Sequence, residues 1–438
     1  PEEAASLTDD HVAELDLTGG IPEASAASLF GGVSRSTFPD LIAEIDDIAE
    51  TDEVKGVFVR LGSIGVGLAR AQEVGRELAR LRDKGLPVVC HADNYGNGTM
   101  LLAAVGCDEI WLSPAGGVDT VGIAAQLIFG RSLLDNLQID VDFLQVGKYK
   151  GAEEPFTRDT ASPEARQSLE NALGAMRSAW IDGITEARDA NTTKLGLEDG
   201  PHSAKAAKER GLIDEIGFLR DARKHALERA GVEGKLDHFG GKPQSDGGMA
   251  ELVRVLSGGD SVGVPHVAVV PLNGSITMSG GGGLFGGGGG ITENATGKLI
   301  RELEHDDAIR AVVLRIDSPG GSALASDLLW RAIMDLRDHK PVVVSVGGMA
   351  ASGGYYLACA GSKIIVEETS IIGSIGVVAG KLSFANRLSE VGISVETVAP
   401  GPNPNRALWG SPMIAWDDST RAKLRESIEA TYDLFLER

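Results

Sequence analysis

The residues best suited to chemistry lie between positions 341 and 356, in the stretch PVVVSVGGMAASGGYY. Its β-branched run predicts a strand over 341–346, the small residues 349–351 predict a short loop, and a helix is expected over 355–360. A serine on a sharp turn between a strand and a helix is exposed for nucleophilic attack, and Ser352 holds that position. Unpaired N–H groups at the helix start can bind an oxyanion. The small residues are equally compatible with simple close packing of a helix on a strand.

A nucleophilic serine needs a base. The eight histidines are scattered, and His339, the nearest in sequence to Ser352, is predicted to lie at the surface. A Ser-His-Asp triad stays open, because its members need to be close only in space. A lysine could also serve if burial lowered its pKa from about 10.4 to about 7, a shift of the size that an apolar pocket can produce. Lys148 and Lys150 in GKYKGAEEPF are candidates, although an isolated lysine usually lies at the surface.

The chain contains an internal repeat with an offset of 254–255 residues. A register kept over more than a hundred residues predicts two copies of one fold. We expect an N-terminal repeat over 1–239, a linker over 240–262 and a C-terminal repeat over 263–438. The matching segments are His11–Gly19 with His266–Gly274, Leu29–Gly32 with Leu284–Gly287, Lys55–Leu61 with Arg310–Ile316, Pro87–Val89 with Pro341–Val343, and Val121–Ile123 with Ile375–Val377.

The two copies differ where the chemistry is expected. The position of Ser352 is occupied by Gly98 in the first copy, and the position of Lys150 by Pro404 in the second. The two glycines of DSPGG, Gly320 and Gly321, correspond to Gly65 and Val66. The copies therefore look complementary, with a nucleophile in one and a candidate base in the other.

Short strands alternate with helices in each copy, which predicts an α/β fold with parallel sheets covered by helices. The end of the second repeat is expected to lie beyond Arg438. The glycine-rich run Gly280–Gly290 is expected to be a mobile loop, or else a linker. The other predicted elements are strands over 266–272, 309–316 and 363–367, helices over 295–304 and 323–337, and helical stretches over 162–189 and 203–230.

Composition excludes several classes of function. The 438 residues carry a net charge of −22, so no basic stripe could meet nucleic acid. The three cysteines, Cys90, Cys107 and Cys359, lack metal-ligand spacing, and we expect neither a metal nor a cofactor. No apolar run approaches the roughly 18–20 residues of a membrane helix. The first residue is Pro1 rather than methionine, so a leader or anchor lost before it would leave no trace.

Four stretches together resemble the signal peptide peptidase A (protease IV) family in its long, tandem-repeat bacterial form. They are GKYKGAEEPFTRD (147–159), RIDSPGG (315–321), GGMAASGGYY (347–356) and TSIIGSIGV (369–377). The resemblance implies two tandem repeats of the ClpP/crotonase type, built from ββα units with helical extensions. It also implies a serine endopeptidase with a Ser–Lys dyad that needs no cofactor.

The resemblance assigns a role to each motif residue. Ser352 would be the nucleophile, Lys150 the general base and Ser374 the residue that orients the lysine. Backbone N–H groups of Gly353 and of the Pro319–Gly321 turn, hence Gly320 and Gly321, would bind the oxyanion. The small residues Gly348, Met349, Ala350 and Ala351 suggest a shallow apolar pocket for the substrate.

The same resemblance implies a setting for the reaction. Substrates would be cleaved signal peptides and other unfolded hydrophobic peptides, bound as an added strand. The family forms homo-oligomers, a tetramer by resemblance, at the bacterial membrane on the periplasmic or extracytoplasmic side, through an anchor absent from this chain. Two alternatives stay open: a crotonase-like acyl-CoA enzyme, and a catalytically dead scaffold of the same fold.

Overall fold

The computed structural model describes residues 10–23, 37–233, 236–238, 265–278, 290–390, 392–393, 395 and 404–438. The expected linker over 240–262, the glycine-rich run apart from Gly290, and the repeat segments at 29–32 and 284–287 lie outside the described residues. In the described part of the chain, no helix is both long enough and apolar enough to cross a membrane.

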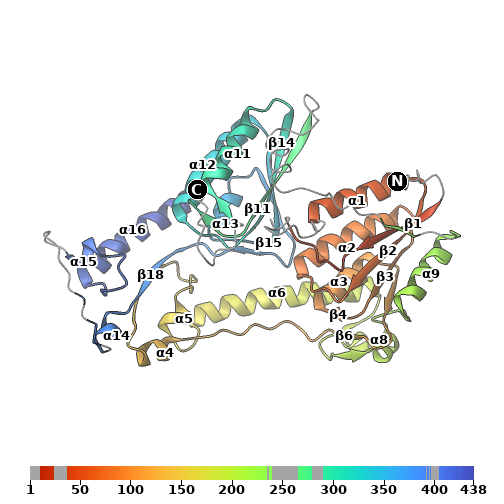
Figure 1. Cartoon of the computed structure of the whole chain (residues 1–438), viewed down its shortest axis with the longest axis horizontal. Helices are drawn as coiled ribbons and strands as arrows, with labels where there is room; N and C mark the ends of the chain where they lie inside the picture. The colour runs from red at the N-terminus through yellow and green to blue at the C-terminus, as the bar shows by residue number, and fades with distance from the viewer. Residues whose placement is uncertain are drawn as a thin grey trace.

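The first half is built on a six-stranded parallel sheet with the strand order β10-β1-β2-β3-β5-β9 (Figure 1). All five residues of β3 are buried, as is typical of a parallel sheet covered on both faces. The strands are β1 (His11–Asp16), β2 (Val54–Gly62), β3 (Val88–Ala92), β5 (Glu109–Leu112), β9 (Glu215–Ile216) and β10 (Leu236–His238). A smaller sheet joins β4 (Tyr95–Gly96), β6 (Gly117–Asp119) and β8 (His202–Ser203).

The second half repeats this plan. Its parallel sheet has the order β11-β14-β15-β16, and β17 also pairs with β15. The strands are β11 (His266–Asn273), β14 (Ile309–Ser318), β15 (Val342–Ala351), β16 (Lys363–Ile365) and β17 (Ile371–Gly373), and β12 (Ile276–Thr277) pairs separately with β13 (Ile291–Thr292).

Amphipathic helices cover both sheets. In α1, Leu41, Ile45 and Ile48 are buried at helical spacing, and Thr37 and Asp40 form a capping box at the N-terminus. In the first half the helices are α1 (Phe38–Glu50), α2 (Leu68–Asp83), α3 (Asn97–Gly106), α7 (Thr192–Leu195), α8 (Ala204–Arg210) and α9 (Leu219–Ala230). In the second half they are α11 (Glu293–His305), α12 (Ala323–His339) and α13 (Gly353–Ala358).

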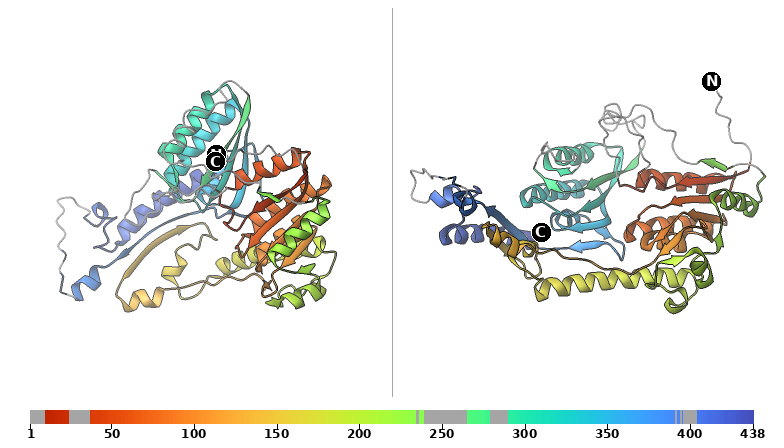
Figure 2. Two further views of the ribbon diagram at one scale, coloured as in Figure 1. Left: turned by 45° about the vertical axis from the view of Figure 1, so that its right-hand side comes forward. Right: turned by 60° about the horizontal axis from the view of Figure 1, so that its bottom comes forward.

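Elements from both halves pack together in a region that we call the arm, which comprises β7 (Asp140–Val146), β18 (Val377–Ser383) and α16 (Asp418–Glu437). Strand β7 of the first half pairs antiparallel with β18 of the second, and α16 packs on both. The long helix α6 (Pro163–Ala187) extends from α3 toward this arm (Figure 2). The remaining helices are α4 (Arg131–Asn136), α5 (Glu154–Thr157), α14 (Ala385–Glu390) and α15 (Pro404–Ala407).

Equivalent elements of the halves recur at the predicted spacing. Helices α1 and α11, α2 and α12, and α6 and α16 each begin 255 residues apart. The α/β class with parallel sheets is confirmed, whereas the domain boundaries at 239 and 263 stay a prediction.

Two local predictions were wrong. Residues 349–351 are not a loop, because they continue β15 and pair with β17. The helical stretch over 203–230 is two helices, because Gly211 adopts a left-handed conformation with φ 84° that ends α8, and strand β9 follows. Helix α13 also begins at Gly353, two residues earlier than predicted.

Candidate active site

Ser352 joins the end of β15 directly to the start of α13. Its backbone has φ 52° and ψ −118°, a region that residues with a β-carbon rarely adopt, and its N–H donates to Gly373 O at 2.8 Å. Such strain is usually found where a surrounding structure holds a functional side chain in place. The predicted junction of strand, serine and helix is therefore present. Ser352 alone separates the strand from the helix, without the loop that was predicted over 349–351.

The DSPGG turn lies against this junction. A β-carbon on Gly320, where φ is 96°, would lie 2.6 Å from Gly353 N and 2.8 Å from Ser352 Cβ. The Gly320 N–H is engaged, because it donates to Ser318 Oγ at 3.1 Å, and Ser318 Oγ in turn donates to Gly274 O. The Gly320 N–H, one of the three predicted oxyanion donors, is thus bonded within the turn and does not face an oxyanion.

The other two predicted donors have free N–H groups within the described part of the chain. Neither Gly321 N nor Gly353 N donates a hydrogen bond to another described residue. They also lie close together, because a β-carbon on Gly353 would be 3.3 Å from Gly321 N. Two neighbouring free N–H groups beside a serine are the arrangement that stabilises a tetrahedral oxyanion.

Lys150, from the first half, contacts Ser374 of the second half, the residue that follows Gly373. Its Nζ donates to Ser374 O at 2.8 Å and to Ser374 Oγ at 3.0 Å. Burial lowers the pKa of Lys150, which favours the neutral amine. A neutral amine has two N–H donors, and Ser374 accepts both, so the lone pair stays available to accept a proton.

One segment of the second half contacts both residues. Gly373 holds the Ser352 backbone, and Ser374 holds the Lys150 amine. Ser352 Oγ and Lys150 Nζ are not hydrogen-bonded to each other here, and such contacts often tighten only when substrate binds. Within this single chain, the adjacent residues Gly373 and Ser374 therefore contact the candidate nucleophile and the candidate base.

The pairing of β7 with β18 determines where Lys150 lies. Val146 pairs with Val377, so the turn that follows β7 meets the residues that precede β18. Gly376 leaves the space for the lysine side chain, because a β-carbon there would lie 2.9 Å from Lys150 Cβ and 2.7 Å from Val146 O. Gly376 belongs to the GSIGV stretch that carries the family resemblance. Its role in making room for Lys150 depends on a contact between the two halves.

From the roles that the resemblance assigns, we expect Gly376→Ala to lower kcat for peptide hydrolysis by about 100-fold, because a displacement of roughly 1 Å at a reacting group has that effect. Gly410→Ala is a matched control, since a β-carbon at Gly410 meets nothing within 4 Å. Steady-state kinetics of the two variants, with melting temperatures to verify folding, test this role. An unchanged kcat in Gly376→Ala would show that the lysine does not need this close approach.

The predicted substrate residues divide into two groups. Gly348 is exposed and Met349 half-buried, whereas Ala350 and Ala351 are buried, Ala350 within the hydrophobic core. The Ala350 side chain is therefore not available to a peptide. The exposed isoleucines of β17, Ile371 and Ile372, which are 40% and 49% exposed, provide an apolar surface beside Met349 instead.

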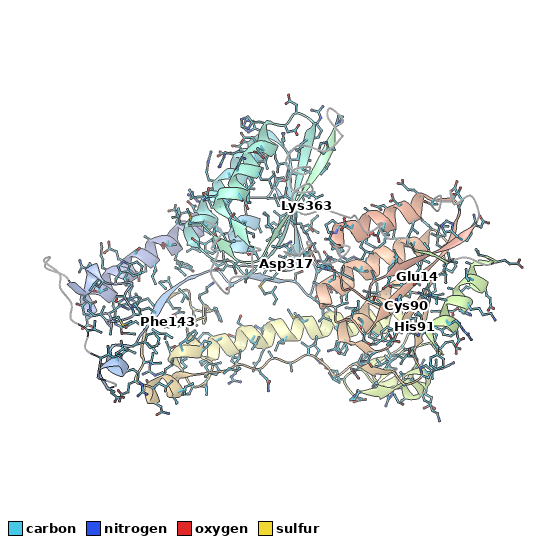
Figure 3. All side chains as sticks on the ribbon, viewed as in Figure 1. Glu14, Cys90, His91, Phe143, Asp317 and Lys363 are labelled. Atoms are coloured by element: carbon cyan, nitrogen blue, oxygen red, sulfur yellow. The ribbon has the colours of Figure 1, made fainter. Side chains whose placement is uncertain are left out.

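Asp317, the first residue of DSPGG, lies near the end of β14 in the sheet of the second half, and Figure 3 labels it. Burial raises its pKa, and Gly348 N donates to its Oδ2 at 3.3 Å. This carboxyl group links the end of β14 to the exposed Gly348 of β15, a role that the sequence pattern did not reveal.

Among its described residues, the first half has no equivalent of the Ser352 site. A β-carbon on Gly98, the counterpart of Ser352, would lie 1.9 Å from Val66 O, so backbone occupies the place of a serine side chain. His339 does not replace Lys150 as a base, because it lies at the exposed end of α12, where its Nδ1 bonds Asp335 O. Among the described residues, no group of three or more His, Cys, Asp or Glu side chains could hold a metal ion.

Comparison with protein families gives two matches. The model of peptidase family S49 matches residues 80–233 and 334–438, and the Clp protease model matches residues 288–372. Both matches are consistent with a ClpP/crotonase-like fold, which agrees with the parallel sheets described above.

Two of the individual proteins compared are similar over most of the chain, and a third over part of it. Protease 4 of Haemophilus influenzae is 30% identical over 92% of this chain and 65% of its own length. The chloroplastic serine protease SPPA of Arabidopsis thaliana is 29% identical over 89% of this chain and 57% of its own length. A putative signal peptide peptidase SppA of Enterococcus faecium is 26% identical over 39% of this chain and 48% of its own length. The chain thus spans less than two thirds of the length of these relatives.

Proposed function

The chain belongs to peptidase family S49, and we propose that it is a serine endopeptidase in which Ser352 is the nucleophile and Lys150 the general base. The observation that carries the proposal is the pair of hydrogen bonds from Lys150 Nζ to Ser374, next to the residue whose carbonyl holds Ser352. Ser374 orients the amine, and the N–H groups of Gly353 and Gly321 form the oxyanion hole.

The proposed mechanism proceeds through an acyl-enzyme. Neutral Lys150 accepts the hydroxyl proton while Ser352 Oγ attacks the scissile carbonyl carbon. The negative charge that develops on the carbonyl oxygen is stabilised by the two N–H groups. Protonated Lys150 then donates its proton to the leaving amine, and a water molecule activated by the same lysine hydrolyses the ester to Ser352.

The proposed substrates are unfolded hydrophobic peptides, among them cleaved signal peptides. The exposed Ile371, Ile372 and Ile375 lie on both sides of Ser374 and give apolar surface close to the site. An extended peptide would add as a strand, with its main chain recognised by backbone groups. We further propose that the protein works at a bacterial membrane, on its extracytoplasmic side, as a homo-oligomer, a tetramer by family resemblance.

Hydrolysis of an unstructured apolar fluorogenic peptide, together with covalent labelling by a fluorophosphonate, tests this function. We expect turnover, and one equivalent of label that peptide mapping assigns to Ser352. Heat-unfolded protein should not be labelled, because an isolated serine is a weak nucleophile. Absence of both turnover and label would overturn the proposal. Tight binding of coenzyme A in that case would favour an acyl-CoA enzyme, and its absence a dead scaffold.

A further inference from the structure

Helix α2 of the first half docks beside the active-site segments of the second. Arg76 pairs with Glu367, and Gln72 Oε1 accepts from Thr369 Oγ1 at 2.8 Å, just before β17 and Ser374. On the same face, Glu73 accepts two hydrogen bonds from Arg315 of β14, at 2.6 and 2.8 Å. One face of α2 therefore contacts the residues just before β17, which lead to Ser374. The same face contacts β14, the strand that leads into the turn containing Gly321.

The contact with Arg315 belongs to a buried cluster of four charges. The members are two arginines and two glutamates, with side chains only 5–12% exposed: Arg70, Arg315, Glu23 and Glu73. Arg315 also bonds Glu23 at 2.9 Å, Arg70 bonds both glutamates, and Phe38 lies under the two guanidinium groups. The two arginines and two glutamates balance in charge, so loss of one carboxylate leaves buried positive charge with less compensation.

The cluster is attached to the strands that form the site. Arg315 Nη1 donates to Val346 O at 3.2 Å and to Ser345 Oγ at 2.9 Å, which ties β14 to β15. Asp317 lies two residues after Arg315, near the end of β14 and just before the turn that contains Gly321, and β15 ends at Ala351, just before Ser352. Arg315 therefore fixes the relative position of the two strands just before they deliver the oxyanion donor and the nucleophile.

The repeat provides an internal comparison. Arg60 occupies the position of Arg315 in the first half, and it forms one pair with Asp16, in which both side chains are about one-third exposed (36% and 33%). The first half also lacks the serine, since Gly98 stands in its place. Of the four charges in the buried cluster, Arg315 therefore comes from the half that has the nucleophile, and Arg70, Glu23 and Glu73 come from the half that has the lysine.

We propose that Glu73 is a positioning residue for catalysis: through Arg315 it holds the oxyanion turn against Ser352 and aligns the two halves across which the dyad is divided. This inference rests on the proposed peptidase function. Bidentate pairing explains why the position carries a glutamate, since one carboxylate fixes the guanidinium in both distance and orientation.

The test compares Glu73→Gln with Glu77→Gln, a control one turn along α2 whose carboxylate pairs with Arg80 at 3.0 Å and is 34% exposed. We expect kcat of Glu73→Gln to fall by about 10- to 100-fold with KM changed less than about twofold, because the lost interaction acts in the transition state. Inhibition by a peptide aldehyde, whose tetrahedral adduct needs the oxyanion donors, should weaken in the same proportion. Inhibition by the matching peptide alcohol should stay the same.

The rates are divided by the concentration of serine labelled by fluorophosphonate, so that unfolded protein is not included in the enzyme concentration. Glu73→Asp, which keeps the charge balance but shortens the reach, should give an intermediate loss even if Glu73→Gln is too unstable to purify. An unchanged kcat per labelled site in either variant, or equal weakening of aldehyde and alcohol, would overturn the positioning role. Failure of the wild-type chain to hydrolyse peptide or take up label would instead count against the proposed function.

Discussion

Replacement of Ser352 by alanine is expected to reduce kcat for peptide hydrolysis by at least about four orders of magnitude, because loss of the nucleophile removes the acyl-enzyme route. Alanine has a β-carbon like serine, so it should keep the same backbone conformation at φ 52°. The measurement is the steady-state rate on an apolar fluorogenic peptide, together with the amount of fluorophosphonate label.

The matched control for this substitution is Ser362→Ala. Ser362 belongs to the same half, and its Oγ donates to Val342 O away from the turn, so the control should hydrolyse peptide at nearly the wild-type rate. Ser352→Gly should be as inactive as Ser352→Ala but relieved of backbone strain, which costs about 1–3 kcal/mol at such positions. Substantial hydrolysis by Ser352→Ala would assign the nucleophile to another residue.

The sequence predicted the parts of the site that depend on local pattern. The β-branched run before Gly347 predicts a strand, and Ser352 followed by two glycines predicts a turn into a helix; both elements are present. The internal repeat predicted the equivalent helices and strands of the halves. It could do so because the spacing of apolar residues and the start of each helix are determined by nearby residues.

Contacts between distant residues leave no trace in local periodicity. Lys150 and Ser374 are 224 positions apart, and only the family resemblance predicted that they meet. Glu73 and Arg315 are 242 positions apart, and neither periodicity nor the resemblance predicted their contact. The loop predicted at 349–351 was wrong for a related reason. Alanine has a low β-propensity, but Ala350 lies between two partner strands, through Ser318 and Ile372, and tertiary pairing overrides the propensity.

Replacement of Lys150 by methionine is expected to lower kcat by about three orders of magnitude, within the range typical of general acid–base catalysis. Methionine preserves the unbranched stem that packs on Gly376, but it has no lone pair of comparable basicity. The measurement is the pH dependence of the hydrolysis rate between pH 6 and 10 for wild type and variant.

The direction of the pH effect follows from burial. Because burial lowers the pKa of Lys150, the neutral, active amine forms at a lower pH than for free lysine at about 10.4. The wild-type rate should therefore rise with pH and level off below 10.4, and the variant should lack this rise. Stability changes in the same direction: between the lowered pKa and about 10.4 the unfolded chain binds more protons, so native stability rises with pH in this window.

Lys148→Met is the matched control, because Lys148 lies two residues away with a side chain that is 70% exposed. It should keep both the rate and the pH profile of the wild-type chain. The melting temperature of Lys150→Met at pH 6 should equal or exceed that of the wild type, since the substitution removes a desolvated ammonium group. A Lys150→Met variant that keeps the rising pH profile would exclude the lysine as the base and direct the search to the histidines. A Lys150→Met variant that is inactive only because it unfolds would show instead that the amine is needed for structure, since its melting temperature would then fall below that of the wild type.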